Sequence, residues 1–237
     1  MSTDEQGRVA IVLGGSGGIG RAVARELAAT GHDLFLIARN QARLEEAAKE
    51  LRDTARGVRT IAGDLADPEA VREQIESAAA AAGRLDVLVN AWGGIARDHA
   101  IRARPASIED NIRDHLVAPM VAAKSAALSM KRSGGGLIIQ LGSIAANEAI
   151  GGAASYGAAK AALLSASRSL QREVEKHGVK VTVISPDRVD TPLHGEEHPE
   201  SSAMLRPEDV AEAVGFVLRL SPTAMVEEVT IRCRGDR

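Results

Sequence analysis

The sequence contains few aromatic residues. Only 2% of its 237 residues are Phe, Trp or Tyr, so its core must be built from Ala, Val, Leu and Ile. It has one cysteine, Cys233, which excludes an internal disulfide framework and fits a reducing compartment. No apolar run approaches the roughly 20 residues needed to span a bilayer, and residues 1–8 do not form a signal peptide. We therefore expect a soluble, cytoplasmic protein.

The charge balance argues against a nucleic-acid partner. The formal net charge is -3, and lysine and arginine form no basic stripe. The length suits one large domain with a well-buried sheet, and no linker, repeat or low-complexity segment marks a second one. We expect a single domain over residues 1–237 that binds neither nucleic acid nor membrane.

Short apolar runs alternate with helix-forming segments. The runs predict strands at residues 8–13, 34–38, 58–62, 85–89, 136–141, 179–184 and 226–232. Between them, capping and amphipathic patterns predict helices at residues 18–29, 41–56, 67–83, 107–131, 153–176 and 206–220. This alternation predicts an α/β fold, a Rossmann-type doubly wound parallel sheet of seven strands with helices on both faces.

A glycine-rich turn joins the first predicted strand to the first predicted helix. It comprises Gly14, Gly15, Ser16, Gly17, Gly18, Ile19 and Gly20. Such a turn lets backbone N–H groups and the helix N-terminus receive a pyrophosphate, although a tight turn with spare glycines is the alternative. A P-loop is disfavoured because Gly-Lys-Ser/Thr is missing. We expect a dinucleotide site.

Tyr156 and Lys160 are four residues apart in a helix-forming, alanine-rich stretch. They therefore stand one above the other on the same helix face. An ammonium beside a phenol favours the phenolate, so we expect the pKa of Tyr156 to fall below its reference of about 10. A tyrosine tuned in this way can exchange a proton with an oxygen on carbon. The pair alone is weak evidence for catalysis, because a surface helix with an incidental aromatic residue has the same spacing.

Taken together, the motifs resemble a known family over nearly the whole chain: the compact, single-domain short-chain dehydrogenase/reductases. The matching segments, in chain order, are Gly14 to Gly20, Asp64-Leu65, Asn90-Ala91-Trp92-Gly93, Ser143, Tyr156-x-x-x-Lys160 and Pro186-Asp187-Arg188-Val189-Asp190-Thr191.

The resemblance implies roles for individual residues. Ser16, Gly18, Ile19 and Gly20 would line the cofactor phosphates and ribose, together with the turn residues Gly14 and Gly17. Asp64 would accept a hydrogen bond from the adenine amino group beside the Leu65 backbone. The rest of the cofactor would be bordered by Asn90, Ala91, Pro186, Val189 and Thr191, the last two holding the carboxamide. Taken alone, Asp64 is better explained as a solvated loop acid and Thr191 as a helix cap; the ordered set of motifs favours the cofactor roles.

The same resemblance implies the chemistry. Ser143 would hydrogen-bond the substrate oxygen, Tyr156 would be the acid in reduction, and Lys160 would hold the ribose hydroxyls; the hydride would come from the cofactor. This predicts an oxidoreductase that interconverts a ketone and a secondary alcohol in a small-molecule carbonyl substrate. The alternative is a cofactor-binding regulatory or scaffold protein with little turnover.

The choice of cofactor depends on the end of the second predicted strand. NAD enzymes of this fold commonly place an acid there, but this chain has Ala38 followed by Arg39. A guanidinium suits a 2′-phosphate through charge-assisted bonds. We therefore expect NADPH, with NADH as the alternative and with a plain surface role for Arg39 as the other interpretation.

The sharpest departure from the family pattern is His115. It stands where the family has an asparagine that completes a proton relay at a helix irregularity. Pro119, four residues later, lacks an N–H, so the His115 carbonyl loses its helical partner and can hold water. Histidine can both donate and accept, so His115 is a candidate catalytic residue, and a helix histidine without a role is the alternative. Asn111, one turn earlier, is another candidate for the relay.

Other features are less specific. Leu13, Trp92 and Asp187 replace the family's usual threonine, small residue and glycine. We expect no metal site: His194, Glu196, Glu197 and His198 suggest an acidic loop, and Arg234-Gly235-Asp236 a chance tripeptide. The family usually forms dimers or tetramers, so we expect a homodimer or homotetramer, with Ala158, Ala162 and Ala166 permitting close helix packing. An apolar substrate pocket is a hypothesis that rests on Trp92, Ile95, Ile144, Ile150 and Met204.

Overall fold

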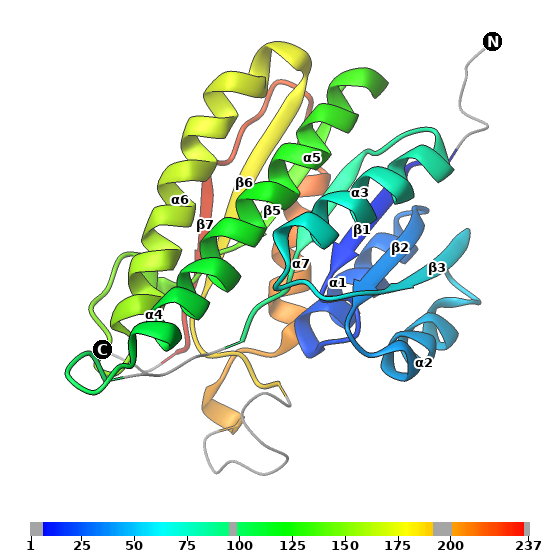
Figure 1. Cartoon of the computed structure of the whole chain (residues 1–237). Coiled ribbons are helices and arrows are strands. Elements are labelled where there is room, and N and C mark those ends of the chain that lie inside the picture. The colour runs from blue at the N-terminus through cyan, green and yellow to red at the C-terminus, as the bar shows by residue number, and fades with distance from the viewer. Residues whose placement is uncertain (1–6, 95–98, 192–200, 235–237) are drawn as a thin grey trace.

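Seven parallel strands form one sheet in the order β3-β2-β1-β4-β5-β6-β7. The computed structural model describes residues 7–94, 99–191 and 201–234 (Figure 1). The strands are β1 (Val9–Leu13), β2 (Asp33–Ala38), β3 (Gly57–Ala62), β4 (Val87–Asn90), β5 (Gly136–Leu141), β6 (Val179–Pro186) and β7 (Glu228–Ile231). The order confirms the predicted doubly wound sheet. Strands β2 and β3 extend it on one side of β1, and β4 to β7 extend it on the other.

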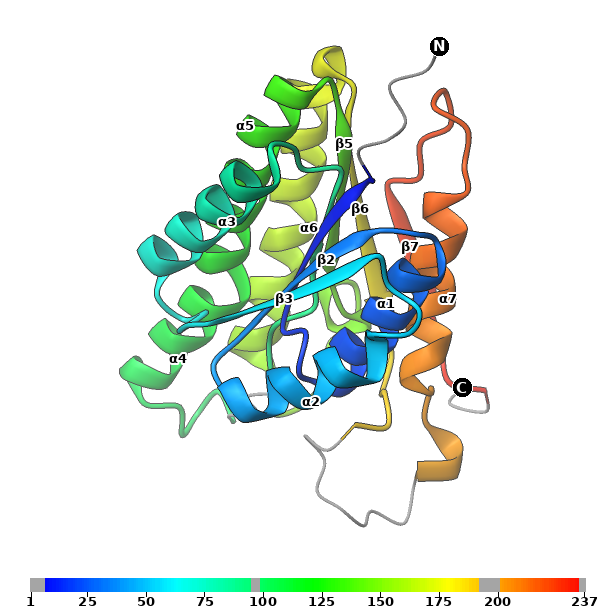
Figure 2. The same ribbon diagram turned by 90° about the vertical axis from the view of Figure 1, so that its right-hand side faces the viewer.

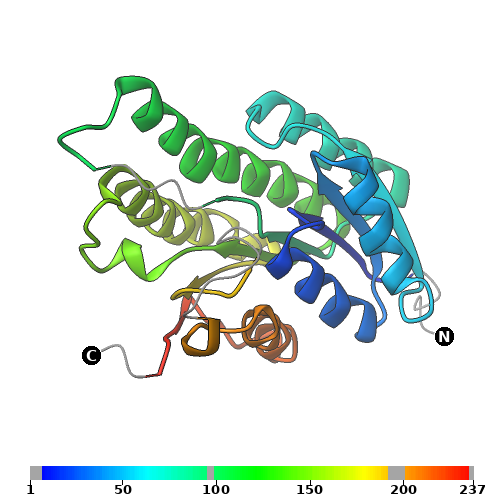
Figure 3. The ribbon, with the colours of Figure 1, turned by 90° about the horizontal axis from the view of Figure 1, so that it is seen from below.

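Helices cover both faces of the sheet, so the fold has three layers (Figure 2). One face carries α1 (Gly18–Ala29), α2 (Gln41–Leu51) and α7 (Pro207–Leu218). The other carries α3 (Pro68–Ala82), α5 (Ala118–Ser133) and α6 (Ala154–Val174), while α4 (Pro105–Ile112) continues into α5 through a π-helical turn. Seen from below, α1, α5 and α6 surround the carboxyl ends of the central strands (Figure 3).

The apolar strand β1 packs on both layers. Ala10 and Val12 face the cluster that includes α1 and α7, whereas Val9, Ile11 and Leu13 face the cluster that includes α3 and α5. A strand buried on both faces reads as a continuous apolar run, which is why its sequence predicts it well. Ala, Val, Leu and Ile make up most of both clusters, as the shortage of aromatic residues requires.

The predicted helix over residues 107–131 is wrong in its start and in its continuity. It begins at Pro105, with Arg104 at the N-cap position and no side-chain cap, because proline suits the first helical position. The sequence Ser107-Ile108-Glu109-Asp110 suggests a capping box that starts the helix at Ser107, but this box does not form; Ser107 Oγ donates to the Arg104 carbonyl instead. The helix is also interrupted at residues 113–117, where the Ala118 N–H donates five residues back to the Arg113 carbonyl.

Other boundaries differ by a few residues. The helix predicted to reach residue 56 ends at Leu51, whose carbonyl accepts from the Thr54 and Ala55 N–H groups in a closing turn. The strand predicted at 85–89 begins at Val87, and the last strand spans Glu228–Ile231 rather than 226–232. Within the described residues, none of the helices combines the length and apolar character needed to cross a membrane.

Candidate active site

The glycine-rich turn forms one end of a cleft at the carboxyl edge of the sheet. Gly14 has a φ of +78°, and its N–H donates 2.8 Å to the Ile37 carbonyl of β2. A Cβ atom at Gly14 would lie 2.8 Å from the Ala91 carbonyl oxygen, and one at Gly20 would lie 2.1 Å from the Gly14 carbonyl oxygen. The turn can therefore be this tight only because these residues lack side chains.

The turn leaves the N-terminus of α1 open. Gly17 at the N-cap makes no side-chain cap, and the first helical bond runs from the Arg21 N–H to the Gly17 carbonyl. The N–H groups of Gly18 and Ile19 precede that bond, and both residues line the cleft. Free N–H groups at a positive helix end suit a phosphate, so this end of the cleft fits the diphosphate of a dinucleotide.

Most of the sequence-predicted cofactor residues line this cleft or the pocket that continues it. The structure brings together Gly14, Ser16, Gly17, Gly18, Ile19, Gly20, Arg39, Ala91, Pro186, Val189, Thr191, Tyr156 and Lys160.

Three predicted residues do not line it. Asp64 is exposed, and its carboxylate accepts from the Ala66 N–H at 3.0 Å. Leu65 is buried in the core, so Ala66 takes its place on the cleft wall. Asn90 donates 2.9 Å to Gln140 on β5 and accepts from the Trp92 N–H at 3.4 Å, so it ties β4 to its neighbours.

A second arginine lines the same cleft as Arg39, and the sequence analysis missed it. Arg43, in the first turn of α2, lines the cleft, and its guanidinium donates 3.5 Å to the Ser16 carbonyl. Arg39 is exposed and makes no hydrogen bond or ion pair with any residue that the structure describes. The four-residue spacing of two arginines at a helix start was the signal that could have identified this cationic pair.

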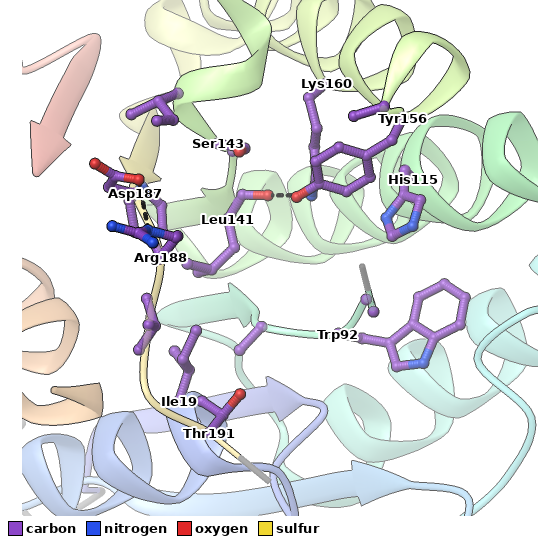
Figure 4. A pocket seen from close by; sticks show the side chains of 18 of the residues that line it. Ile19, Trp92, His115, Leu141, Ser143, Tyr156, Lys160, Asp187, Arg188 and Thr191 are labelled. Carbon is purple, nitrogen blue, oxygen red and sulfur yellow. Dashed lines mark hydrogen bonds between the residues drawn. The ribbon is translucent and has the colours of Figure 1, made fainter. Parts of the chain in front are cut away.

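Ser143, Tyr156 and Lys160 meet in a pocket that opens into the cleft (Figure 4). Ser143 follows β5, and its hydroxyl accepts from the Ala145 N–H at 3.2 Å. Tyr156 and Lys160 project from the first turns of α6, and Lys160 Nζ lies 5.8 Å from the Tyr156 ring centroid. Lys160 is 4% exposed, and its ammonium donates 2.7 Å to the Leu141 carbonyl of β5. The predicted triad is therefore assembled.

The predicted direction of the Tyr156 pKa shift is wrong in this structure. Burial raises the pKa of Tyr156 above its ordinary value, and the hydrogen bond with Ser143 only partly offsets this. Burial also lowers the pKa of Lys160 to about 8. Spacing alone placed the two groups side by side, but it did not reveal that elements distant in sequence bury Lys160 and much of the Tyr156 side chain. Tyr156 is therefore a protonated hydroxyl at neutral pH, able to donate a proton.

His115 lies in the π-helical turn, where the sequence predicted an irregularity. Its side chain is 3% exposed and lines both the cleft and the pocket. Its ring meets the Tyr156 ring edge-on, with centroids 4.9 Å apart. Burial, with a smaller effect of the Lys160 charge, lowers the pKa of His115 to about 3. It is therefore neutral at physiological pH and packs edge-on against the tyrosine as a polar, uncharged ring.

The buried histidine predicts acid sensitivity. In the unfolded chain the pKa of His115 returns to about 6.5, so the unfolded state binds a proton that the folded state excludes. The stabilisation is present above pH 6.5 and is lost as the pH falls toward 3. Between pH 6.5 and 5, we expect His115 alone to lower the free energy of unfolding by about 2 kcal/mol, measured by urea denaturation. His115→Asn is the control: an equally steep decline in that variant would contradict the assignment.

The rest of the pocket wall combines apolar and charged groups. Trp92, Ile144 and Ile150 line it as hypothesised, whereas Met204 does not, and Ile95 lies outside the described residues. On the opposite side, Asp187 replaces the expected glycine and accepts from the N–H groups of Arg188 at 2.8 Å and Cys233 at 3.3 Å. This links the pocket wall to the segment that follows β7.

Several expectations cannot be placed. The acidic segment with His194, Glu196, Glu197 and His198 lies outside the described residues, as does most of the Arg234-Gly235-Asp236 tripeptide. Within residues 7–94, 99–191 and 201–234, no group of His, Cys, Asp or Glu could hold a metal ion.

Known proteins are similar to this chain in sequence. A sequence model described as short chain dehydrogenase matches residues 8–202. An uncharacterized oxidoreductase of Staphylococcus saprophyticus is 35% identical over 96% of this chain and 97% of its own length.

Solved structures are similar as well. An alcohol dehydrogenase from the archaeon Thermococcus sibiricus, complexed with 5-hydroxy-NADP, has 31% identity and a TM-score of 0.88, covering 97% of this chain and 98% of its own. A short-chain dehydrogenase/reductase from Serratia marcescens has 27% identity and a TM-score of 0.89, covering 96% of this chain and 97% of its own. The chain belongs to the short-chain dehydrogenase/reductase family, whose members are oxidoreductases that use nicotinamide cofactors.

Proposed function

We propose that the protein is an NADPH-dependent ketoreductase that interconverts a ketone and a secondary alcohol by hydride transfer. The observation that carries this proposal is the convergence of Ser143, Tyr156 and Lys160 in a pocket continuous with the dinucleotide-sized cleft. A pocket open to the cleft allows a carbonyl carbon to approach the nicotinamide end of a bound cofactor.

In this proposal, the residues of the chain position and protonate the substrate oxygen. The Ser143 hydroxyl donates a hydrogen bond to the carbonyl oxygen, and Tyr156 gives it a proton as it becomes an alkoxide. Lys160 already donates to the Leu141 carbonyl, which leaves two of its three N–H groups for the ribose hydroxyls. The nicotinamide cofactor supplies the hydride when bound.

The cofactor would extend from the glycine turn to the pocket. The turn residues Gly14 to Gly20 hold the diphosphate, and Ala91, Pro186, Val189 and Thr191 border the nicotinamide half. Asp64 is the proposed partner of the adenine amino group, with one carboxylate oxygen already bound to the Ala66 N–H. Leu65 would support the site by anchoring the chain beside Asp64 in the core. Asn90 would support it through its hydrogen bond from β4 to Gln140 of β5.

We assign His115 a catalytic part in the same site. Its neutral ring lies beside Tyr156 and lines the cleft, and an imidazole can both donate and accept, so we propose that it relays a proton through water in the cleft without acquiring a lasting charge. This takes over the relay that an asparagine performs in the family.

Cofactor preference is the most direct test of the proposal. Arg39 and Arg43 both line the adenosine end of the cleft, and the alcohol dehydrogenase of Thermococcus sibiricus is complexed with an NADP derivative. Charge-assisted bonds to a 2′-phosphate favour NADPH over NADH. Quenching of the single tryptophan, Trp92, which lines the cleft, reports binding of either cofactor.

We expect Arg39→Asp to weaken NADPH binding by about 10- to 100-fold while leaving NADH binding unchanged or improved, because one charged hydrogen-bonding group contributes about 1.5–3 kcal/mol. Arg52→Asp, which makes the same charge change at an exposed position just beyond α2, is the matched control and should leave both affinities near wild type. Equal affinity of the wild type for NADH and NADPH would contradict the assignment.

The alternative, a regulatory or scaffold protein with little turnover, is not favoured because all three catalytic side chains are in place. A screen of ketones with NADPH separates the two functions: cofactor binding without reduction of any ketone would support the alternative.

We further propose a cytoplasmic homodimer or homotetramer that acts on a small-molecule carbonyl substrate. Apolar side chains are exposed along one continuous helical element, at Ile108 of α4, Val117 of the π turn, and Met120 and Leu128 of α5. A row of exposed apolar residues suits packing against a second copy. Light scattering should give two or four times the mass of 24.8 kDa, and a monomer would contradict this part of the proposal.

A further inference from the structure

Glu228 of β7 carries a carboxylate that the surrounding chain largely covers, with its side chain 16% exposed. Removing a carboxylate from water is unfavourable unless other groups donate hydrogen bonds to it. Ser185 of β6 donates 2.9 Å and Asn147 donates 3.2 Å to its Oε1 atom. Arg168 of α6 donates 3.4 Å to the other oxygen, Oε2. The carboxylate therefore joins β6, β7 and α6 to the segment that follows β5.

That segment carries Ser143 and has little structure of its own. The pairing of β5 with β6 ends at Leu141, so Ser143 lies just beyond the ladder and leads into a single 3-10 turn, Ile144–Ala146. The Asn147 N–H closes this turn by donating 3.0 Å to the Ile144 carbonyl. One 3-10 turn is only weakly stable by itself, so its position depends on what holds its two ends.

Glu228 holds the chain on both sides of Ser143. On the far side it accepts from the Asn147 side chain at the end of the turn. On the near side it binds the Ser185 hydroxyl, which lies directly against Gly142, because a Cβ at Gly142 would be 2.6 Å from Ser185 Oγ. A displacement of the carboxylate would therefore be transmitted to Ser143 from both directions.

A second link ties the same turn to the segment after β7. Arg232 forms an ion pair with Glu148, and the two side chains are 50% and 41% exposed. Ion pairs between exposed side chains contribute little, whereas charge-assisted hydrogen bonds to a largely covered carboxylate are stronger. We therefore expect Glu228, rather than the Arg232–Glu148 pair, to fix the turn.

We propose that Glu228 is a positioning residue for Ser143, and that it holds the serine hydroxyl where it and the Tyr156 hydroxyl reach one substrate oxygen. Glu228 is not among the residues that line the pocket or the cleft, so it acts only through the segments that it binds. The effect on catalysis rests on the proposed function, whereas the hold on the turn does not.

Kinetics of neighbouring glutamate variants test the effect on catalysis. We expect Glu228→Leu to lower kcat by about 5- to 50-fold with NADPH affinity near wild type, because a small misplacement of a group at the reacting atoms slows the reaction. Glu228→Gln keeps an acceptor for Asn147 and Ser185 and should recover most of the activity. Glu227→Leu is the matched control, because Glu227 is exposed and pairs with arginines of α6 instead. An equal loss in Glu227→Leu would overturn the proposal.

The pH profile and a double variant separate positioning from a purely structural role. The hydrogen bond with Ser143 lowers the pKa of Tyr156, so a displaced serine should shift the pH profile of kcat toward higher pH. Once Ser143→Ala has removed the hydroxyl, adding Glu228→Leu should cost little more, because the two changes act on one interaction. Fully additive losses, or an unshifted pH profile in Glu228→Leu, would overturn the positioning role.

Deuterium exchange tests the hold on the turn without any substrate. We expect the backbone amides of residues 143–148 to exchange faster in Glu228→Leu, but not in Glu227→Leu. Asn147→Leu cuts only the link beyond Ser143 and changes an exposed residue, so it supplies both the exchange and the kinetic test if Glu228→Leu does not fold. If the wild type reduces no ketone, the proposed function fails, and exchange still decides the hold. Unchanged exchange in the folded variants would overturn it.

Discussion

Replacing Tyr156 with phenylalanine is expected to lower kcat for carbonyl reduction by about 10²- to 10⁴-fold, because the variant removes the proton donor and little else. The ring remains, so its edge-on contact with His115 and its contact with Lys160 are retained. NADPH affinity, followed by Trp92 fluorescence, should therefore change little. The loss should appear in kcat rather than in KM, since proton transfer is an interaction of the transition state.

Ser143→Ala is the companion variant. The Ser143 hydroxyl helps to bind the carbonyl oxygen in the proposed reaction, but it does not give up the proton. It also lowers the pKa of Tyr156, which burial raises. We expect a smaller loss than in Tyr156→Phe, together with a shift of the pH profile of kcat toward higher pH. Reduction at the wild-type rate by Tyr156→Phe would exclude Tyr156 as the proton donor.

The strands could be predicted from the sequence because a parallel sheet covered on both faces is built from apolar runs. β1 is the clearest case, with all five residues buried. The edge strand β3 has no fully buried residue, yet it was found because a β-branched run follows a glycine. The irregularity at residues 113–117 was expected from the family resemblance and from Pro119, but the pattern of apolar residues did not indicate it, because one altered hydrogen bond leaves no mark in that pattern.

Part of the candidate site could likewise be predicted from the sequence, and part could not. Ser143, Tyr156 and Lys160 could be predicted to meet, because strand ends and one helix face determine where they lie. The pKa of Tyr156 could not, because it depends on burial by elements distant in sequence. The bond from Asn111 to Ser155 spans 44 residues and joins two helices, so no local pattern signals it. Asn90 was assigned to the cofactor, but its partner Gln140 lies on a neighbouring strand and draws the side chain into the sheet.

The geometry of the glycine turn predicts that alanine at Gly20 both destabilises the fold and weakens cofactor binding. A Cβ at Gly20 would lie 2.1 Å from the Gly14 carbonyl oxygen and 3.0 Å from the Gly15 Cα, closer than side-chain carbons approach backbone atoms. The turn cannot move away, because Gly14 is bound to the Ile37 carbonyl and itself packs against Ala91. Gly20→Ala must therefore displace either the turn or the first turn of α1, and both hold the proposed diphosphate.

We expect Gly20→Ala to lower the melting temperature by about 4–10 °C, as overpacking of about 1–3 kcal/mol would in a chain of this size, and to weaken NADPH binding at least about tenfold. Gly17→Ala is the matched control in the same turn. Its φ of -85° suits any residue, and its Cβ would lie 3.3 Å from the Gly14 carbonyl oxygen, a contact that a shift of a few tenths of an ångström relieves. Calorimetry should therefore separate the two alanine variants. Equal melting temperatures of the two variants would mean that the turn can move despite its hydrogen bonds and packing. The shape of the phosphate site would then depend on the bound cofactor rather than on the folded chain.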